Sequence, residues 1–114
     1  MVGQIQRTRG KAAYRRAADA AGKKPLNTVL PAITGTATEG ETLTSSTGTW
    51  TNTPDAYAYQ WRRDGVPVAG ATASTHVLTA DDVGSAMSCT VTAANEGVST
   101  SATSAPTAVV EADE

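Results

Sequence analysis

The sequence has no phenylalanine, a single cysteine and a single histidine among its 114 residues. Cys89 cannot form an internal disulfide, and one cysteine supports neither a four-ligand zinc cluster nor a CxxC redox pair. A catalytic triad built on an imidazole would have to use His76. No run of 18 apolar residues is present, so we expect no membrane-spanning helix.

An apolar leader segment is also lacking. The basic start of the chain is followed by mixed alanine and arginine rather than by a continuous apolar stretch, which argues against a secretory signal. We therefore expect a chain that starts at its own Met1 and is made in the cytoplasm. The length suits one domain of about 100 residues with a short appendage, and it leaves no room for a second core.

Positive charge is scarce outside the first 24 residues. This basic arm (residues 1–24) holds seven of the nine basic residues and only one acidic residue, for a net charge of +6. Residues 25–114 hold two basic and ten acidic residues, for a net charge of −8. An asymmetry of this size is typical of an interaction tail beside an ordinary domain.

The basic arm combines alanine pairs with arginine and lysine, so it is expected to be extended or partly helical, with Lys11–Ala21 able to form three turns. Arginine suits bidentate contacts to carboxylates, and Tyr14 suits an aromatic interface anchor. The predicted partner contacts are Arg7, Arg9, Lys11, Tyr14, Arg15, Arg16, Lys23 and Lys24. The same residues are compatible with a solvated tail, with contact to the acidic domain of another copy, or with nucleic-acid phosphates.

From Pro25 onward the composition changes to threonine, β-branched residues and regularly spaced turn signals, which predicts an all-β antiparallel sandwich over residues 25–110. Residues 56–63 alternate most clearly, with Tyr57, Tyr59 and Trp61 on one face. Hairpin turns are expected at Asp64–Gly65 and at residues 95–97. Residues 111–114 form an acidic tail that we expect to fray. The predicted core is Ile33, Leu43, Trp50, Tyr57, Tyr59, Trp61, Leu78, Met87, Cys89 and Val91.

Three candidate sites for chemistry are weak. His76 alternates inward and is expected at the edge of the core rather than as a general base. Asp81 and Asp82 precede Gly84 in a turn, where aspartate usually bonds to nearby backbone rather than to a metal. Cys89 is expected to be buried and inert. We therefore predict no catalytic residues, no metal and no cofactor.

Seven short motifs in order resemble the bacterial and phage immunoglobulin-like repeats over residues 31–110. They are Ile33-Thr-Gly, Gly40-Glu-Thr-Leu, Gly48-Thr-Trp, Tyr59-Gln-Trp-Arg-Arg-Asp-Gly, Gly70-Ala-Thr, Leu78-Thr-Ala-Asp-Asp-Val-Gly and Cys89-Thr-Val-Thr-Ala-Ala-Asn. Two features depart from the family. Leu43 stands where disulfide-bonded domains have a second cysteine, and Met87 stands where the tyrosine corner has its tyrosine.

A lone domain of this kind behind a basic arm resembles a tailed-phage capsid decoration protein. That resemblance implies a non-enzymatic virion component on the capsid exterior, with the major capsid protein lattice and copies of itself as partners. A different reading is a module that binds carbohydrate or the host surface through Trp50, Tyr57 or the loop over residues 51–56. A nucleic-acid-associated protein is the third reading, although an acidic domain would be repelled by DNA.

Overall fold

A computed structural model describes residues 24–113 and is all-β, with antiparallel sheets and one short 3-10 helix. This confirms the predicted all-β class. The strands are β1 (Asn27–Val29), β2 (Ile33–Thr34), β3 (Thr42–Ser45), β4 (Thr49–Trp50), β5 (Ala56–Arg63), β6 (Val66–Pro67), β7 (Thr75–Val77), β8 (Met87–Asn95) and β9 (Val98–Thr103), with η1 (Ala80–Asp82) between β7 and β8.

The larger layer is the four-stranded sheet β6-β5-β8-β9. Its hairpins turn where glycine permits a positive φ, at Asp64–Gly65 (50° and 83°) and at Glu96–Gly97 (52° and 84°). Both predicted turns are therefore confirmed. Pro67 lies in the edge strand β6, where its missing N–H disrupts no inner ladder.

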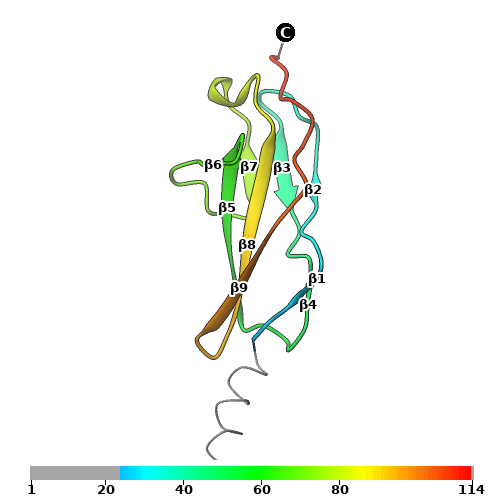
Figure 1. Ribbon diagram of the computed structural model, residues 1–114. Helices are drawn as coiled ribbons and strands as arrows, with labels where there is room; N and C mark the ends of the chain where they lie inside the picture. The colour runs from blue at the N-terminus through cyan, green and yellow to red at the C-terminus, as the bar shows by residue number, and fades with distance from the viewer. Residues whose placement is uncertain (1–23, 114) are drawn as a thin grey trace, which may run out of the picture.

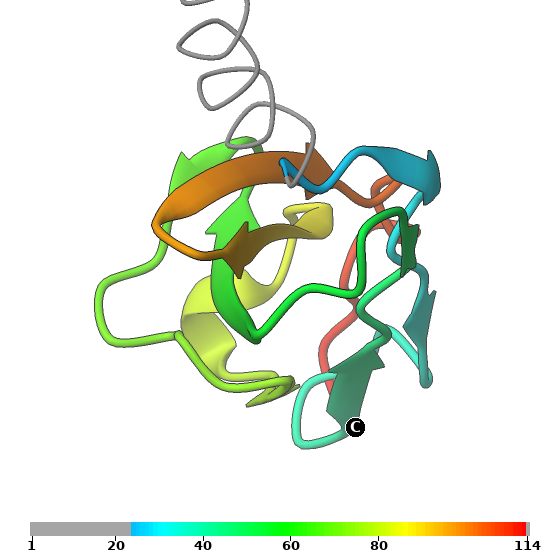
Figure 2. The ribbon, with the colours of Figure 1, turned by 90° about the horizontal axis from the view of Figure 1, so that it is seen from below.

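In the second layer, the chain segment that contains β1 and β2 runs beside the segment that contains β3 and β4, and the pairing of the two segments is interrupted between β1 and β2. β1 pairs with β4 and β2 pairs with β3, all antiparallel, and β7 continues the layer beside β3. Between the two halves, the Ser46 N–H donates to the Ala32 carbonyl oxygen at 2.9 Å, so the chain segments stay together across the break. Figures 1 and 2 show this layer beside the four-stranded sheet.

The core lies between the layers and is centred on Trp61, which is fully buried and donates its indole N–H to the Ala73 carbonyl oxygen at 2.8 Å. Alternation along β8 points Met87, Cys89 and Val91 inward, as predicted. The other buried apolar members are Leu43, Trp50, Leu78, Ala93 and Val110.

The inward prediction for Tyr57 is wrong, because its side chain is 40% exposed. The first three residues of β5 are all exposed, and burial sets in only from Tyr59 onward. At that end of β5 the opposite layer consists only of the short β1–β4 pair (Figure 1). The alternation in the sequence therefore extends past the part of β5 that the opposite layer covers.

After β9 the chain continues along β8 and then crosses to the other layer. The N–H groups of Ser104 and Thr107 donate to Cys89 and Met87, and Ala86 forms an antiparallel bridge with Val109. Glu111 then forms a parallel bridge with Thr38. Fraying from Glu111 is therefore wrong: two backbone hydrogen bonds hold this residue to the segment before β3.

One buried carboxylate joins the two layers. Asp82 in η1 is fully buried, and its Oδ1 accepts from Arg63 of β5 at 2.7 Å (Nη2) and 2.8 Å (Nε). Its Oδ2 accepts from the Thr79 backbone N–H at 2.9 Å and lies 3.0 Å from Nε2 of His76 in β7. The His76 ring stacks on Trp61 with centroids 5.6 Å apart. Each donor belongs to a different part of the fold.

These donors also determine how Asp82 titrates. Burial alone raises the pKa of the Asp82 carboxyl, but hydrogen bonds from the Thr79 backbone, Arg63 and His76 favour the anion and bring the pKa below its ordinary value. The folded state therefore holds the carboxylate more strongly than the unfolded chain does.

Replacing Asp82 with alanine is expected to lower the free energy of unfolding by about 2–4 kcal/mol, because it leaves the Thr79 backbone N–H and the partly exposed Arg63 guanidinium without their acceptor. Urea unfolding measures the change. Asp81→Ala is the matched control: Asp81 is exposed, so its loss should change stability by less than about 0.5 kcal/mol. Equal effects of the two substitutions would contradict the assigned role.

The lowered pKa of Asp82 also predicts an acid-dependent loss of stability. A carboxyl with a depressed folded pKa contributes fully above its unfolded pKa of about 4, and the contribution disappears as pH falls through the folded value. The free energy of unfolding should thus decrease below about pH 4. Asp82→Asn should remove that part of the slope, which urea unfolding at a series of pH values will detect.

Candidate functional site

Of the eight predicted partner contacts, only Lys24 lies within the described residues. Lys24 is exposed, and its backbone carbonyl oxygen accepts a hydrogen bond from Nδ2 of Asn52 at 2.9 Å. The other predicted contacts lie outside the described residues: Arg7, Arg9, Lys11, Tyr14, Arg15, Arg16 and Lys23. The structure therefore defines where the basic arm joins the domain.

A set of hydrogen bonds, here called the clamp, fixes this junction to the loop after β4. The Leu26 N–H donates to Thr51 Oγ1 at 3.0 Å, and the Thr51 N–H donates back to the Leu26 carbonyl oxygen at 2.9 Å. Asn95 at the end of β8 donates from Nδ2 to the Asn52 carbonyl oxygen at 2.6 Å. Pro25, between Lys24 and Leu26, is buried. The arm thus leaves the domain from a fixed point.

The clamp loop has an unusual backbone. Asn52 and Thr53 have φ values of 63° and 44°, a region that asparagine tolerates but that is a clear outlier for a β-branched residue such as Thr53. Such strain persists where surrounding contacts hold it. Here the contacts are the hydrogen bonds from Asn52 to Lys24 and from Asn95 to Asn52.

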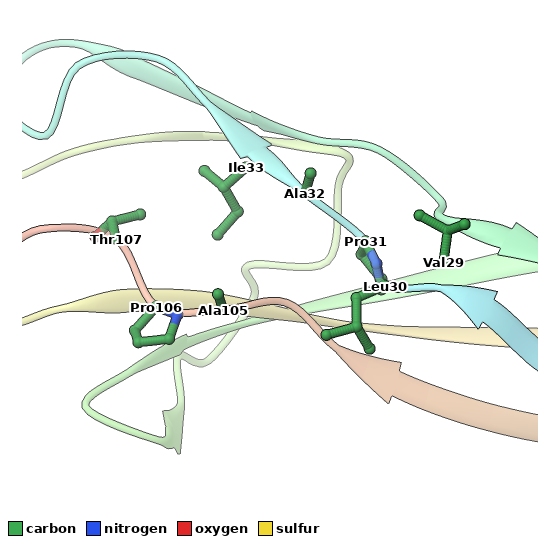
Figure 3. A pocket seen from close by; sticks show the side chains of 8 residues that line it. All are labelled: Val29, Leu30, Pro31, Ala32, Ile33, Ala105, Pro106 and Thr107. Atoms are coloured by element: carbon green, nitrogen blue, oxygen red, sulfur yellow. The ribbon is translucent and has the colours of Figure 1, made fainter.

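Exposed aliphatic side chains follow directly after the clamp. Leu26, Val29 and Leu30 are 55%, 58% and 55% exposed. Val29 and Leu30 also open onto a cavity of about 500 Å³, here called the edge groove, at the side where the two layers meet. Its lining residues are Val29, Leu30, Pro31, Ala32, Ile33, Ala105, Pro106 and Thr107 (Figure 3).

The edge groove exists because both edge segments break at a proline. Pro31 falls between β1 and β2, and Pro106 falls after β9, so neither segment offers an N–H for a ladder at that level. The segment around Val29 and Pro31 packs closely against Gly48, where a Cβ would clash with the Val29 carbonyl oxygen. The two segments stand apart, and the space between them is lined by uncharged side chains (Figure 3).

Charge on the domain is placed unevenly. Glu39 and Glu111 are adjacent through the Glu39 N–H, which donates to the Glu111 carbonyl oxygen at 2.8 Å, and Glu41 lies on the turn that follows. Asp113 continues from Glu111, so these carboxylates gather at the C-terminal pole, opposite the β1–β4 end (Figure 1). The arm junction and this acidic pole are at opposite ends of the domain.

The structure brings His76 and Asp82 together as part of the inter-layer contact, with His76 Nε2 3.0 Å from Asp82 Oδ2. Asp81 is exposed while Asp82 is buried, so the two carboxylates do not converge on one point. Cys89 is buried, and burial raises the pKa of its thiol, which disfavours the reactive thiolate. Within residues 24–113 no group of three or more His, Cys, Asp or Glu is arranged to hold a metal.

Two further observations bear on partners. Trp50 is buried and donates its indole N–H to the Thr47 carbonyl oxygen at 2.6 Å, so of the two aromatics considered for a surface site only Tyr57 is exposed.

Among the described residues, no helix is long and apolar enough to cross a bilayer.

The edge groove and the clamp were not predicted from the sequence. Pro31 and Pro106 signal broken strands, but their juxtaposition depends on how residues 75 positions apart meet in space. The hydrogen bonds of Asn52 depend on its positive φ, which no local sequence motif predicts.

Comparison of the chain with protein-family models, with curated proteins and with solved structures finds no match. The interpretation of the site therefore depends on the residues themselves.

The clamp predicts different outcomes for two substitutions of Asn52. Asn52→Gly removes the hydrogen bond to Lys24 but keeps the positive φ accessible, so it should cost about 0.5–1.5 kcal/mol and speed hydrogen exchange of the Thr51 amide. Asn52→Ala should cost about 1 kcal/mol more because alanine resists that backbone conformation. Unchanged Thr51 exchange in both variants would show that the clamp does not hold the junction.

Proposed function

We propose that this protein is a non-enzymatic virion component that decorates or cements a bacteriophage capsid through its basic arm and displays an immunoglobulin-like domain outward. The observation that carries the proposal is the separation of charge. A segment of net charge +6 joins a domain of net charge −8 at one clamped point, and the acidic pole lies at the opposite end.

The strand arrangement supports the immunoglobulin-like part of the proposal. Sheets of the order β6-β5-β8-β9 and β2-β3-β7, with a parallel bridge between Thr38 and Glu111, are the arrangement expected of a small sandwich of that kind. Immunoglobulin-like domains serve many roles, so the fold alone does not identify the partner.

The basic arm is suited to attachment. Extended, 24 residues reach about 80 Å at about 3.3 Å each, enough to cross from one capsid subunit to its neighbours. Its four arginines can each bind a carboxylate with two parallel hydrogen bonds, and Tyr14 adds an aromatic anchor. A capsid surface rich in carboxylates fits this composition.

The position of the junction supports outward display. The clamp fixes the arm at the end of the domain farthest from Glu39, Glu41 and Glu111 (Figure 1). A carboxylate-rich lattice would attract the arm and repel the acidic pole, while Asp55 and Glu96 are the two carboxylates beside the clamp that the arm's positive charge has to outweigh. The same acidic domain disfavours binding to DNA.

Co-sedimentation with DNA-free heads of the source phage, beside naked duplex DNA at about 0.15 M salt, tests the proposal. The full-length chain should bind heads and not DNA, and a 25–114 truncation that circular dichroism shows to be folded should bind neither. A truncation that still binds heads, or binding of the full-length chain to DNA alone, contradicts the proposal. Binding to neither favours a host-surface glycan instead.

Charge variants of the full-length chain refine this test. Replacing Arg7, Arg9, Arg15 and Arg16 with glutamine lowers the charge of the arm from +6 to +2 and should reduce head binding at least tenfold. The matched control replaces the same four residues with lysine. Lysine keeps the charge but not the bidentate geometry, so intermediate binding is expected if both contribute.

A further inference from the structure

The edge groove combines a hollow with protruding apolar side chains. Ile33 and Leu30 line one side and Ala105 and Pro106 the other, and none of the lining residues is charged (Figure 3). Val29 and Leu30 at its rim are more than half exposed. A cavity of about 500 Å³ beside exposed aliphatic side chains is suited to receiving apolar side chains of another molecule.

Charge is missing from both chain segments that border the groove. Residues 25–38 supply one side and residues 97–110 the other, and neither stretch contains a lysine, arginine, aspartate or glutamate. The same holds for residues 42–54, which pair with the first segment through β3 and β4. Residues 25–114 nevertheless carry a net charge of −8. Two copies of the domain therefore meet the least electrostatic repulsion where these uncharged segments face each other.

We propose that the edge groove binds a second copy of this chain, in a two-fold symmetric contact that places Leu30 of each copy against the groove of the other. A two-fold contact uses the same patch on both copies, so that patch must hold both the protruding group and the hollow that receives it. Leu30, which is 55% exposed, and the groove beside it meet this requirement. The contact is made between domains and does not rest on the proposed capsid role.

The size of the patch determines the strength of the contact. Stable interfaces use about 20–30 residues from each partner. The groove has eight lining residues, and Leu26 extends the exposed aliphatic surface beyond them. We therefore expect monomers in dilute solution and dimers at high concentration. The same contact becomes favourable wherever another interaction holds two copies close together.

Sedimentation equilibrium of the full-length chain between about 1 μM and about 1 mM measures this association. Leu30→Asp puts a carboxylate of each copy into the apolar contact and should weaken the association by about tenfold or more. Val66→Asp is the matched control. Val66 is 64% exposed in β6, at the opposite edge of the four-stranded sheet from β9, so the substitution adds the same charge and should leave the association unchanged. Circular dichroism should show both variants to be folded.

Salt separates this contact from binding of the basic arm to the acidic domain of another copy. The apolar contact should persist from about 0.05 M to about 0.5 M salt, whereas a contact between opposite charges weakens as they are screened. Dilution should shift the backbone amide signals of Ile33 and Thr107 in a ¹⁵N correlation spectrum and leave that of Val66 unchanged.

Three results would each overturn the proposal. The first is a chain that stays monomeric at about 1 mM. The second is an equal loss of association in Leu30→Asp and Val66→Asp. The third is an association that salt abolishes, which would assign it to the arm and the acidic domain instead.

Discussion

The contact between Asp82, Arg63 and His76 places a demand on the whole domain. A carboxylate with no exposed surface must be met by donors at hydrogen-bond distance, and here those donors come from β5, from β7 and from the backbone that begins η1. Any shift of one layer against the other would separate this charge from a donor. His76 extends the constraint into the core through its stack on Trp61. This polar contact therefore links both layers and the core through one side chain.

Much of the fold could be predicted because it depends on residues that are close together in the sequence. The inward positions of Met87, Cys89 and Val91 and the two hairpin turns depend only on neighbouring residues, and the structure has them as predicted. The inward prediction for Tyr57 was wrong because alternation shows which residues share a face of the strand but not how far the opposite layer extends. The role of Asp82 was predicted in part. Its turn position implied a backbone partner, whereas Arg63 and His76 come from distant strands that no local pattern relates.

The candidate site, too, could be predicted only in part. Its charge could be predicted from composition, since counting residues separates the basic arm from the acidic domain. Its geometry could not, because the clamp and the edge groove arise where separate loops meet: Leu26 against Thr51, and Leu30 beside Ala105. Composition thus separates the basic arm from the acidic domain, and the fold shows at which end of the domain the two join and which apolar surface lies nearby.

The β1–β4 end, where the described chain begins, and the C-terminus lie at opposite ends of the domain, which has a practical meaning for engineering (Figure 1). The polypeptide enters the domain at one pole and leaves it at the other, so a peptide or protein fused after residue 114 would start a full domain length away from the arm. Glu111 is held by backbone hydrogen bonds to Ala37 and Glu39, which gives such a fusion a firm base only a few residues away. The domain would then serve as a spacer between the basic arm and a foreign epitope.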